Sequence, residues 1–226
     1  MKMHAQTRSV REKSSALAWL GGVFGMAGAK KAPLKGGLRI AIAAVADALT
    51  ALPLSGMIIG GVAVIARGVP RTTRDVDLTV EGGKLELPDL VVQLEMVGFE
   101  PRIDGAIAFA AANQVLLLRH TSSGVDIDLS IAWLPFETEA IAAAESLNLA
   151  GAQVRVARAE DLVIYKAIAF RPQDQQDIER LATLHGDTID FDRVRRIVGQ
   201  FAEALDEPER AVQVEQLLTR VLDGRR

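Results

Sequence analysis

The spacing of apolar residues in the first two thirds of the chain changes repeatedly between that of a helix and that of a strand. Ile42, Val45 and Leu49 lie three or four residues apart, as in an amphipathic helix, and Pro53 ends the pattern. From Asp75 to Val80, polar and apolar residues alternate, which is typical of a half-buried strand. The same criteria predict a helix near 42–52, a strand at 57–59, a brief helix at 62–66, a strand at 75–80, a helix at 88–97, strands at 114–119 and 125–132, and a short strand at 153–156.

From Ala159 onward the pattern is helical throughout. Predicted helices cover about 160–170, 173–185, 190–205 and 208–222, separated by Pro172, Gly186 and Pro208. Strands mixed with helices, followed by helices alone, indicate an α/β (α+β) fold in which helices flank a mixed sheet. We therefore predict a core over 38–157 and a helical C-terminal region over 158–226.

The first 37 residues leave two readings open. A basic stretch ending at Lys13, an uncharged run 14–29 and the small residues Ala27-Gly28-Ala29 have the form of a secretory signal. Glu12 and the four glycines of the run argue against it, and we favour a poorly ordered leader or linker, or a mis-assigned start. The run is too short and too rich in glycine for a transmembrane helix, so no membrane association is expected.

Composition excludes several classes of site. The chain carries 26 Lys plus Arg and 29 Asp plus Glu, a net charge of −3, with no long basic block, so a broad electrostatic grip on nucleic acid is not encoded. There are no cysteines, which excludes disulfides, thiolate metal sites and a cysteine nucleophile. A cytoplasmic location is compatible with this composition.

Asp75 and Asp77 are the most informative residues for chemistry. Two positions apart on a strand, they project from the same face. Such a pair repels unless a cation neutralises it, and Mg²⁺, or Mn²⁺, prefers one or two carboxylates together with substrate phosphate oxygens. The alternative is a solvated strand end, and only the surrounding residues favour the metal site.

Those surroundings consist of a glycine turn and a basic segment. Gly60-Gly61 allows backbone to approach a phosphate closely, and N–H groups at a helix start favour an anion. The segment Arg71-Thr72-Thr73-Arg74 directly precedes the two aspartates, and Arg71 and Arg74 are suited to holding a triphosphate. Salt bridges to the neighbouring aspartates are the alternative role for the arginines, above all for Arg74.

A second acidic strand carries Asp126 and Asp128, again on one face. If it lies beside the first, a third carboxylate reaches the metal site, as in-line phosphoryl transfer with two cations can use. We choose Asp128 as the third ligand or base. Asp126 remains an alternative ligand, or a solvated residue at the start of the strand.

The stretch Ile58-Ile59-Gly60-Gly61 through Arg71-Thr72-Thr73-Arg74-Asp75-Val76-Asp77-Leu78 resembles the first motif of the polymerase-beta-like nucleotidyltransferase superfamily. The later residues Glu160-Asp161-Leu162, Lys166 and 171–178 are similar to motifs of the AbiEii-type abortive-infection toxin nucleotidyltransferases. The resemblance implies a nucleotidyltransferase core that uses a nucleoside triphosphate and Mg²⁺. It also implies that Lys166 contacts the triphosphate and that Asp174 or Asp177 completes the site. Gly60-Gly61 stands where the superfamily often has Gly-Ser.

The residues of the later segment also have ordinary readings. The ordinary interpretation of Lys166 is a surface lysine, and Asp174 and Asp177 near a helix start can serve the helix macrodipole.

From the motifs and the resemblance together, we expect nucleotidyl transfer from a nucleoside triphosphate to a hydroxyl of a tRNA, a protein or a small molecule. If the protein is a toxin of the AbiEii type, an antitoxin protein is expected as its partner. The rival hypothesis is a catalytically silent module that binds nucleotide or a protein partner.

Overall fold

The computed structural model describes residues 36–52, 54–82 and 86–224. The described residues form two compact units, 36–158 and 159–224. The first contains every strand of the described chain, and the second is helical. Nearly all of the predicted leader, residues 1–35, lies outside the described residues, while Gly36 and Gly37 begin the first described helix.

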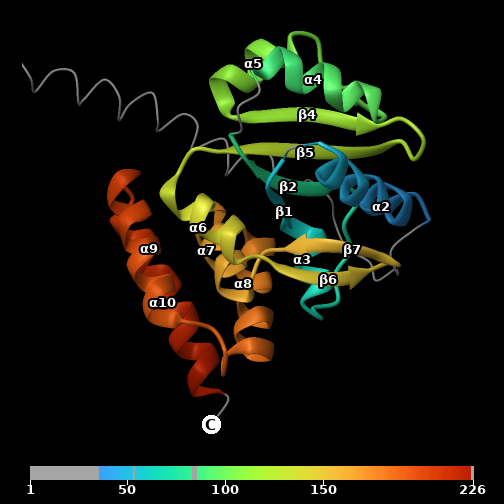
Figure 1. The fold of residues 1–226 in the computed structure, drawn as a ribbon. Coiled ribbons are helices and arrows are strands. Elements are labelled where there is room, and N and C mark those ends of the chain that lie inside the picture. The colour runs from blue at the N-terminus through green and yellow to red at the C-terminus, as the bar shows by residue number, and fades with distance from the viewer. Residues whose placement is uncertain (1–35, 53, 83–85, 225–226) are drawn as a thin grey trace, which may run out of the picture. The chain divides into compact units, whose positions relative to one another are not determined.

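A seven-stranded mixed sheet runs through the first unit (Figure 1). Its strands, in spatial order, are β3 (Phe99–Pro101), β4 (Val115–His120), β5 (Val125–Ala132), β2 (Val76–Glu81), β1 (Gly56–Ile59), β7 (Ala152–Val156) and β6 (Glu145–Leu149). Strand β2 pairs in parallel with β5, β1 pairs in parallel with β7, and the other pairs are antiparallel. With helices flanking the sheet, this confirms the predicted fold class.

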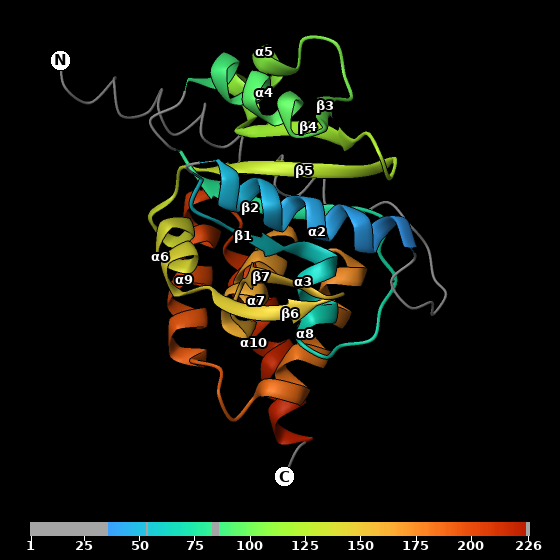
Figure 2. The ribbon, with the colours of Figure 1, turned by 45° about the vertical axis from the view of Figure 1, so that its right-hand side comes forward.

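Helix α2 (Gly36–Ala51) contributes much of the core of this unit. It packs on β2, β5 and β7, as Figure 2 shows. Its Val45 faces Leu78 and Ile127 of the sheet, together with Leu94 of α4 (Leu87–Met96). Apolar residues at alternate positions of β2 and β5 thus point to the helical layer, and the polar residues between them point to the opposite face.

Strand β2 differs from its prediction because both of its faces are buried. Asp77 and Thr79 are as inaccessible as Val76 and Leu78, although alternation predicts a half-buried strand. The reason is position, because β2 is the central strand of the seven. Polar side chains on its second face are therefore held in a low-dielectric environment, where a charge needs a partner.

Other elements lack a clear sequence pattern and were not predicted. They are β3, β6, α5 (Ala106–Asn113) and α6 (Pro135–Ala143). Strand β3 has three residues and includes a proline, and α5 is mostly alanine without an apolar stripe. Glu137 lies in the first turn of α6, and its side chain accepts from the backbone N–H groups of Trp133 and Leu134 at 3.0 and 3.1 Å.

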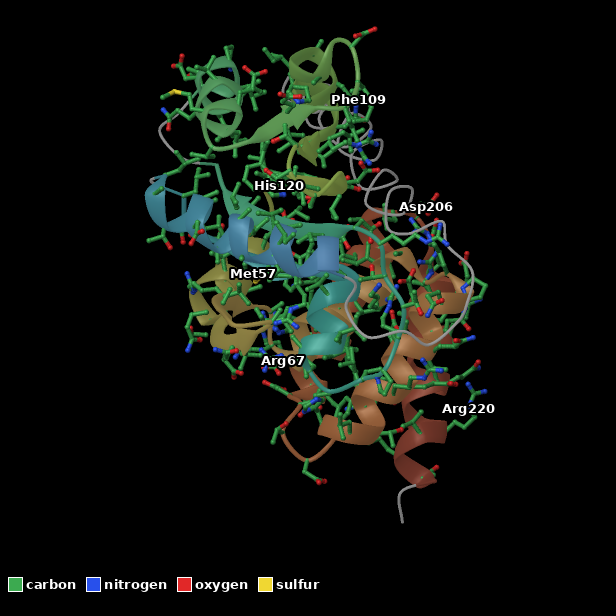
Figure 3. All side chains as sticks on the ribbon, turned by 90° about the vertical axis from the view of Figure 1, so that its right-hand side faces the viewer. Met57, Arg67, Phe109, His120, Asp206 and Arg220 are labelled. Carbon is green, nitrogen blue, oxygen red and sulfur yellow. The ribbon has the colours of Figure 1, made fainter. Side chains whose placement is uncertain are left out.

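The short helix α3 (Gly60–Ala66) follows β1 directly and is fixed at its far end by Arg67 (Figure 3). The Arg67 guanidinium donates to the carbonyl oxygens of Val156 and Ala157 at 3.1 and 2.8 Å. It also pairs with Glu145 at 2.5 Å. These bonds tie the glycine turn and its helix to strands β6 and β7.

The second unit consists of α7 (Ala159–Ala169), α8 (Pro172–His185), α9 (Phe191–Ala204) and α10 (Pro208–Asp223). Helix α7 packs against α8 and α9, and α10 packs against the same two helices. A buried ion pair joins α7 to α9, with Asp161 Oδ1 and Arg193 Nη1 2.6 Å apart. Within the described residues, no helix combines the length and apolarity required to cross a membrane.

Candidate functional site

The acidic strands β2 and β5 are direct neighbours in the sheet. In their register Asp77 lies opposite Asp128, and on its other side Asp77 lies opposite Ile59, the last residue of β1. Both carboxylates are almost fully buried, with 3% and 5% of their surface exposed. The condition for a third carboxylate near the first two, adjacency of the two acidic strands, is therefore met.

The glycine turn packs against Asp77. Gly60 has a φ of +61°, a conformation that favours glycine, and a Cβ at this position would overlap the Asp77 carboxylate. A Cβ on Gly61 would lie 2.5 Å from Thr73 Oγ1 and 3.2 Å from Arg71 Cζ. Both glycines are therefore required for the close approach of the aspartate and the basic segment to the backbone.

The segment before β2 also contacts the carboxylates. Thr73 Oγ1 donates to Asp75 Oδ1 at 2.7 Å, which orients that carboxylate at the start of the strand. Arg71 and Thr73 are half-buried beside Gly61, whereas the side chain of Arg74 is exposed. Six of the predicted residues, namely Gly60, Gly61, Arg71, Thr73, Asp75 and Asp77, thus gather at one end of β1 and β2.

Arg102 was missed by sequence reasoning, although it contacts two of the predicted carboxylates. Its Nη2 lies 2.5 Å from Asp128 Oδ1, and its Nη1 lies 2.9 Å from Asp126 Oδ2. Arg119 Nε contacts the other oxygen of Asp126 at 2.8 Å. Asp126, with 34% of its side chain exposed, is therefore held in an arginine network at the edge of the site.

The buried position of Asp128 alters its acidity. Burial raises the pKa of the carboxyl group from 3.8 to about 6, the Arg102 guanidinium opposes that rise, and the Asp75 and Asp126 carboxylates add to it. At neutral pH the group is ionised, yet it is a better proton acceptor than an ordinary aspartate. This matches the requirement for a general base.

The donor set accommodates a divalent cation only together with a substrate. Among the described residues, no three His, Asp or Glu side chains gather closely enough to hold a metal ion by themselves. Asp75 and Asp77 supply carboxylate oxygens on one strand end, and Mg²⁺ commonly combines one or two such groups with phosphate oxygens. The residues present fit a cation shared with a triphosphate.

The remaining predicted residues form a separate cluster within the helical unit. Lys166 Nζ lies 2.8 Å from Asp174 Oδ1 and 3.4 Å from Asp177 Oδ2, and all three residues are at most 5% exposed. The interpretation of Lys166 as a surface lysine is therefore wrong. Asp174 also accepts from the backbone N–H of Arg171 at 3.1 Å, so it caps the start of α8 as well.

Solved structures with a similar fold include three nucleotidyltransferase-related chains. An antigenic nucleotidyltransferase-like protein from Paracoccidioides brasiliensis is 19% identical, with 81% of this chain and 95% of that chain covered and a TM-score of 0.49. The antibiotic-resistance factor ANT(2″)-Ia in solution is 22% identical, with 76% and 94% covered and a TM-score of 0.50. A crystal structure of ANT(2″)-Ia in complex with adenylyl-2″-tobramycin is 22% identical, with 73% and 97% covered and a TM-score of 0.48.

The sequence itself gives the family. No curated protein matches the chain. Residues 39–217 match the family model described as "Nucleotidyl transferase of unknown function (DUF2204)", which covers the sheet, the glycine turn, both acidic strands and most of the helical unit. The resemblance to nucleotidyltransferases is thereby confirmed: the chain belongs to this nucleotidyl transferase family and is an enzyme of that class.

Proposed function

We propose that the protein transfers a nucleotidyl group from a nucleoside triphosphate to a hydroxyl group, with Mg²⁺ or Mn²⁺ as the cation. One observation carries the proposal. Asp77 lies in register with Asp128, its carboxylate packs against the Gly60 turn, and Asp75 lies two residues before it. Carboxylates beside a glycine turn suit a cation and a triphosphate bound together.

Each residue has a distinct role in this proposal. Asp75 and Asp77 hold the cation, which when bound adds positive charge at the phosphate oxygens and lowers the pKa of the attacking hydroxyl. The Gly60-Gly61 turn with Arg71, Thr73 and Arg74 holds the triphosphate.

Asp128 accepts the proton of the attacking hydroxyl. The hydroxyl oxygen forms a bond to the α-phosphorus while the bond from that phosphorus to the β-phosphate bridging oxygen breaks, and pyrophosphate leaves. The raised pKa of Asp128, with burial as its main cause, supports this role because a base with a pKa closer to neutrality transfers protons more effectively.

For the helical unit we propose that Lys166 contacts the triphosphate and that Asp174 and Asp177 orient its ammonium group. The support is the two ion pairs of 2.8 and 3.4 Å, which fix the lysine in one place. A buried lysine held by two carboxylates is costly to maintain for stability alone, and a functional role is a common reason for such clusters.

The acceptor and the biological setting are further proposals. Candidate acceptors are the 3′ end of a tRNA, a protein side chain and a small molecule, and the net charge of −3 favours the last two over a broad nucleic-acid surface. A role as an AbiEii-type toxin with an antitoxin partner rests on the residues 160–178 alone. A nucleoside triphosphate substrate fits a cytoplasmic location.

The experiment incubates the protein with each of the four nucleoside triphosphates, labelled at the α-phosphorus, and Mg²⁺. Total cellular RNA, total protein and a small-molecule extract are offered as acceptors in separate reactions. Incorporation of label into one fraction, with none for Asp77→Asn, is the expected result. Nucleotide binding without label transfer to any fraction would favour the silent module.

A further inference from the structure

Arg102 sits where its charge is shared between two carboxylates of the candidate site. It follows β3, and its backbone N–H donates to the carbonyl oxygen of Leu117 on β4 at 3.0 Å. Its guanidinium then reaches across to β5, contacting Asp128 at 2.5 Å and Asp126 at 2.9 Å. A fixed backbone and two ion pairs therefore place this cation at the carboxylates.

The pair with Asp128 is largely removed from water. The side chain of Arg102 is 22% exposed, and that of Asp128 is 6% exposed. Arg119, by contrast, is 55% exposed and contacts Asp126 only. Ion pairs are stronger where water is excluded. The Arg102–Asp128 pair is therefore stronger than the Arg119–Asp126 pair.

A divalent cation on Asp128 would have to compete with this guanidinium. Arg102 occupies Oδ1 at the distance of a short charge-assisted hydrogen bond. A second cation binding that carboxylate would displace the guanidinium or lie a few ångströms from a like charge.

We propose that Arg102 is a positioning residue that takes the place of a second divalent cation at Asp128, so that the site holds one divalent cation per bound nucleotide. This inference rests on the proposed function. Arg102 keeps Asp128 ionised and fixed in orientation, while Asp75 and Asp77 hold the single cation with the triphosphate. The expected consequence is a change in cation stoichiometry when the guanidinium is removed.

The test measures bound Mn²⁺ by electron paramagnetic resonance, in the full-length chain saturated with a non-cleavable α,β-methylene nucleoside triphosphate. Wild type should bind about one Mn²⁺ per chain, and Arg102→Ala and Arg102→Gln should bind about two. Arg102→Lys retains a positive charge and should stay near one. Adding Asp128→Asn to Arg102→Ala should remove the additional ion.

Arg119→Ala is the matched control. It removes an arginine from the same network without touching Asp128, and it should leave the stoichiometry at about one. Two ions in wild type, or one ion in whichever of the Ala and Gln variants folds, would overturn the inference. Absence of any nucleotide-dependent Mn²⁺ binding in wild type would instead overturn the proposed function, so the two failures are distinguishable.

Discussion

Replacing Asp128 with Asn should make the stability of the sheet unit less sensitive to pH. In the folded protein, burial raises the pKa of Asp128 from 3.8 to about 6. The unfolded chain therefore releases this proton first, and the stability of wild type falls as pH rises from about 3.8 through about 6. Asn cannot ionise, so the variant avoids this loss.

The magnitude follows from the two pKa values. Each unit of difference corresponds to about 1.4 kcal/mol, and integration between pH 4.5 and 7.5 gives about 2 kcal/mol. The free energy of unfolding of Asp128→Asn, relative to wild type, should therefore rise by about 2 kcal/mol over this interval. Effects of pH on groups that do not interact with Asp128 are the same in both proteins and cancel in the difference.

Urea unfolding at the two pH values, in EDTA to keep the protein free of metal, measures this difference. The chain has two tryptophans, and Trp133 directly follows β5, so its fluorescence in a Trp19→Phe background reports the sheet unit. Asp126→Asn is the matched control, since its half-exposed ion pairs contribute at most about 1 kcal/mol. If the free energy of unfolding of Asp128→Asn relative to wild type is the same at pH 4.5 and 7.5, or falls between them, the reasoning is refuted.

Gly60→Ala should abolish transfer and lower the free energy of unfolding by more than Gly105→Ala, because both have positive φ but only a Cβ at Gly60 meets a carboxylate; equal urea midpoints would contradict this. Lys166→Ala should destabilise by about 3–5 kcal/mol in urea, because two buried aspartates lose the ammonium group that they share. If the Lys166 ammonium group contacts the triphosphate, both Lys166→Ala and Lys166→Arg should bind nucleotide more weakly. Unchanged nucleotide binding in both variants would show that Lys166 is not part of the site. Mg²⁺ with nucleotide should raise the melting temperature of wild type, and no shift with any of four nucleotides would count against the site.

Local patterns in the sequence predicted the parts of the fold that depend on local spacing. Alternation identified β2 and β5, the apolar run identified β1, and breaks at proline and glycine separated the helices of the C-terminal region. The Gly60-Gly61 break after β1 was also predicted, but for approach to a phosphate; the close contact of Gly60 with the Asp77 carboxylate was not predicted.

The properties that depend on contacts between residues far apart in the sequence could not be predicted from local patterns. Parallel pairing of β2 with β5 brings Asp77 opposite Asp128, although the two residues are far apart in the chain, and this pairing could be stated from the sequence only as a condition. Arg102 follows a three-residue strand that has no pattern of its own, so nothing placed it near Asp126 and Asp128. Burial of Lys166 arises because nearly every position of α7 is buried, which a short run of mixed residues does not reveal.

The central claim is that the carboxylates beside the glycine turn support transfer of a nucleotidyl group. The most direct measurement compares nucleoside triphosphates labelled at the α-phosphorus with those labelled at the γ-phosphorus, for wild type and for Asp77→Asn with an unchanged thermal melt. Wild type should transfer α-label to an acceptor and release γ-label only in pyrophosphate, and Asp77→Asn should do neither. Transfer of γ-label to the acceptor, or full α-label transfer by Asp77→Asn, would contradict it.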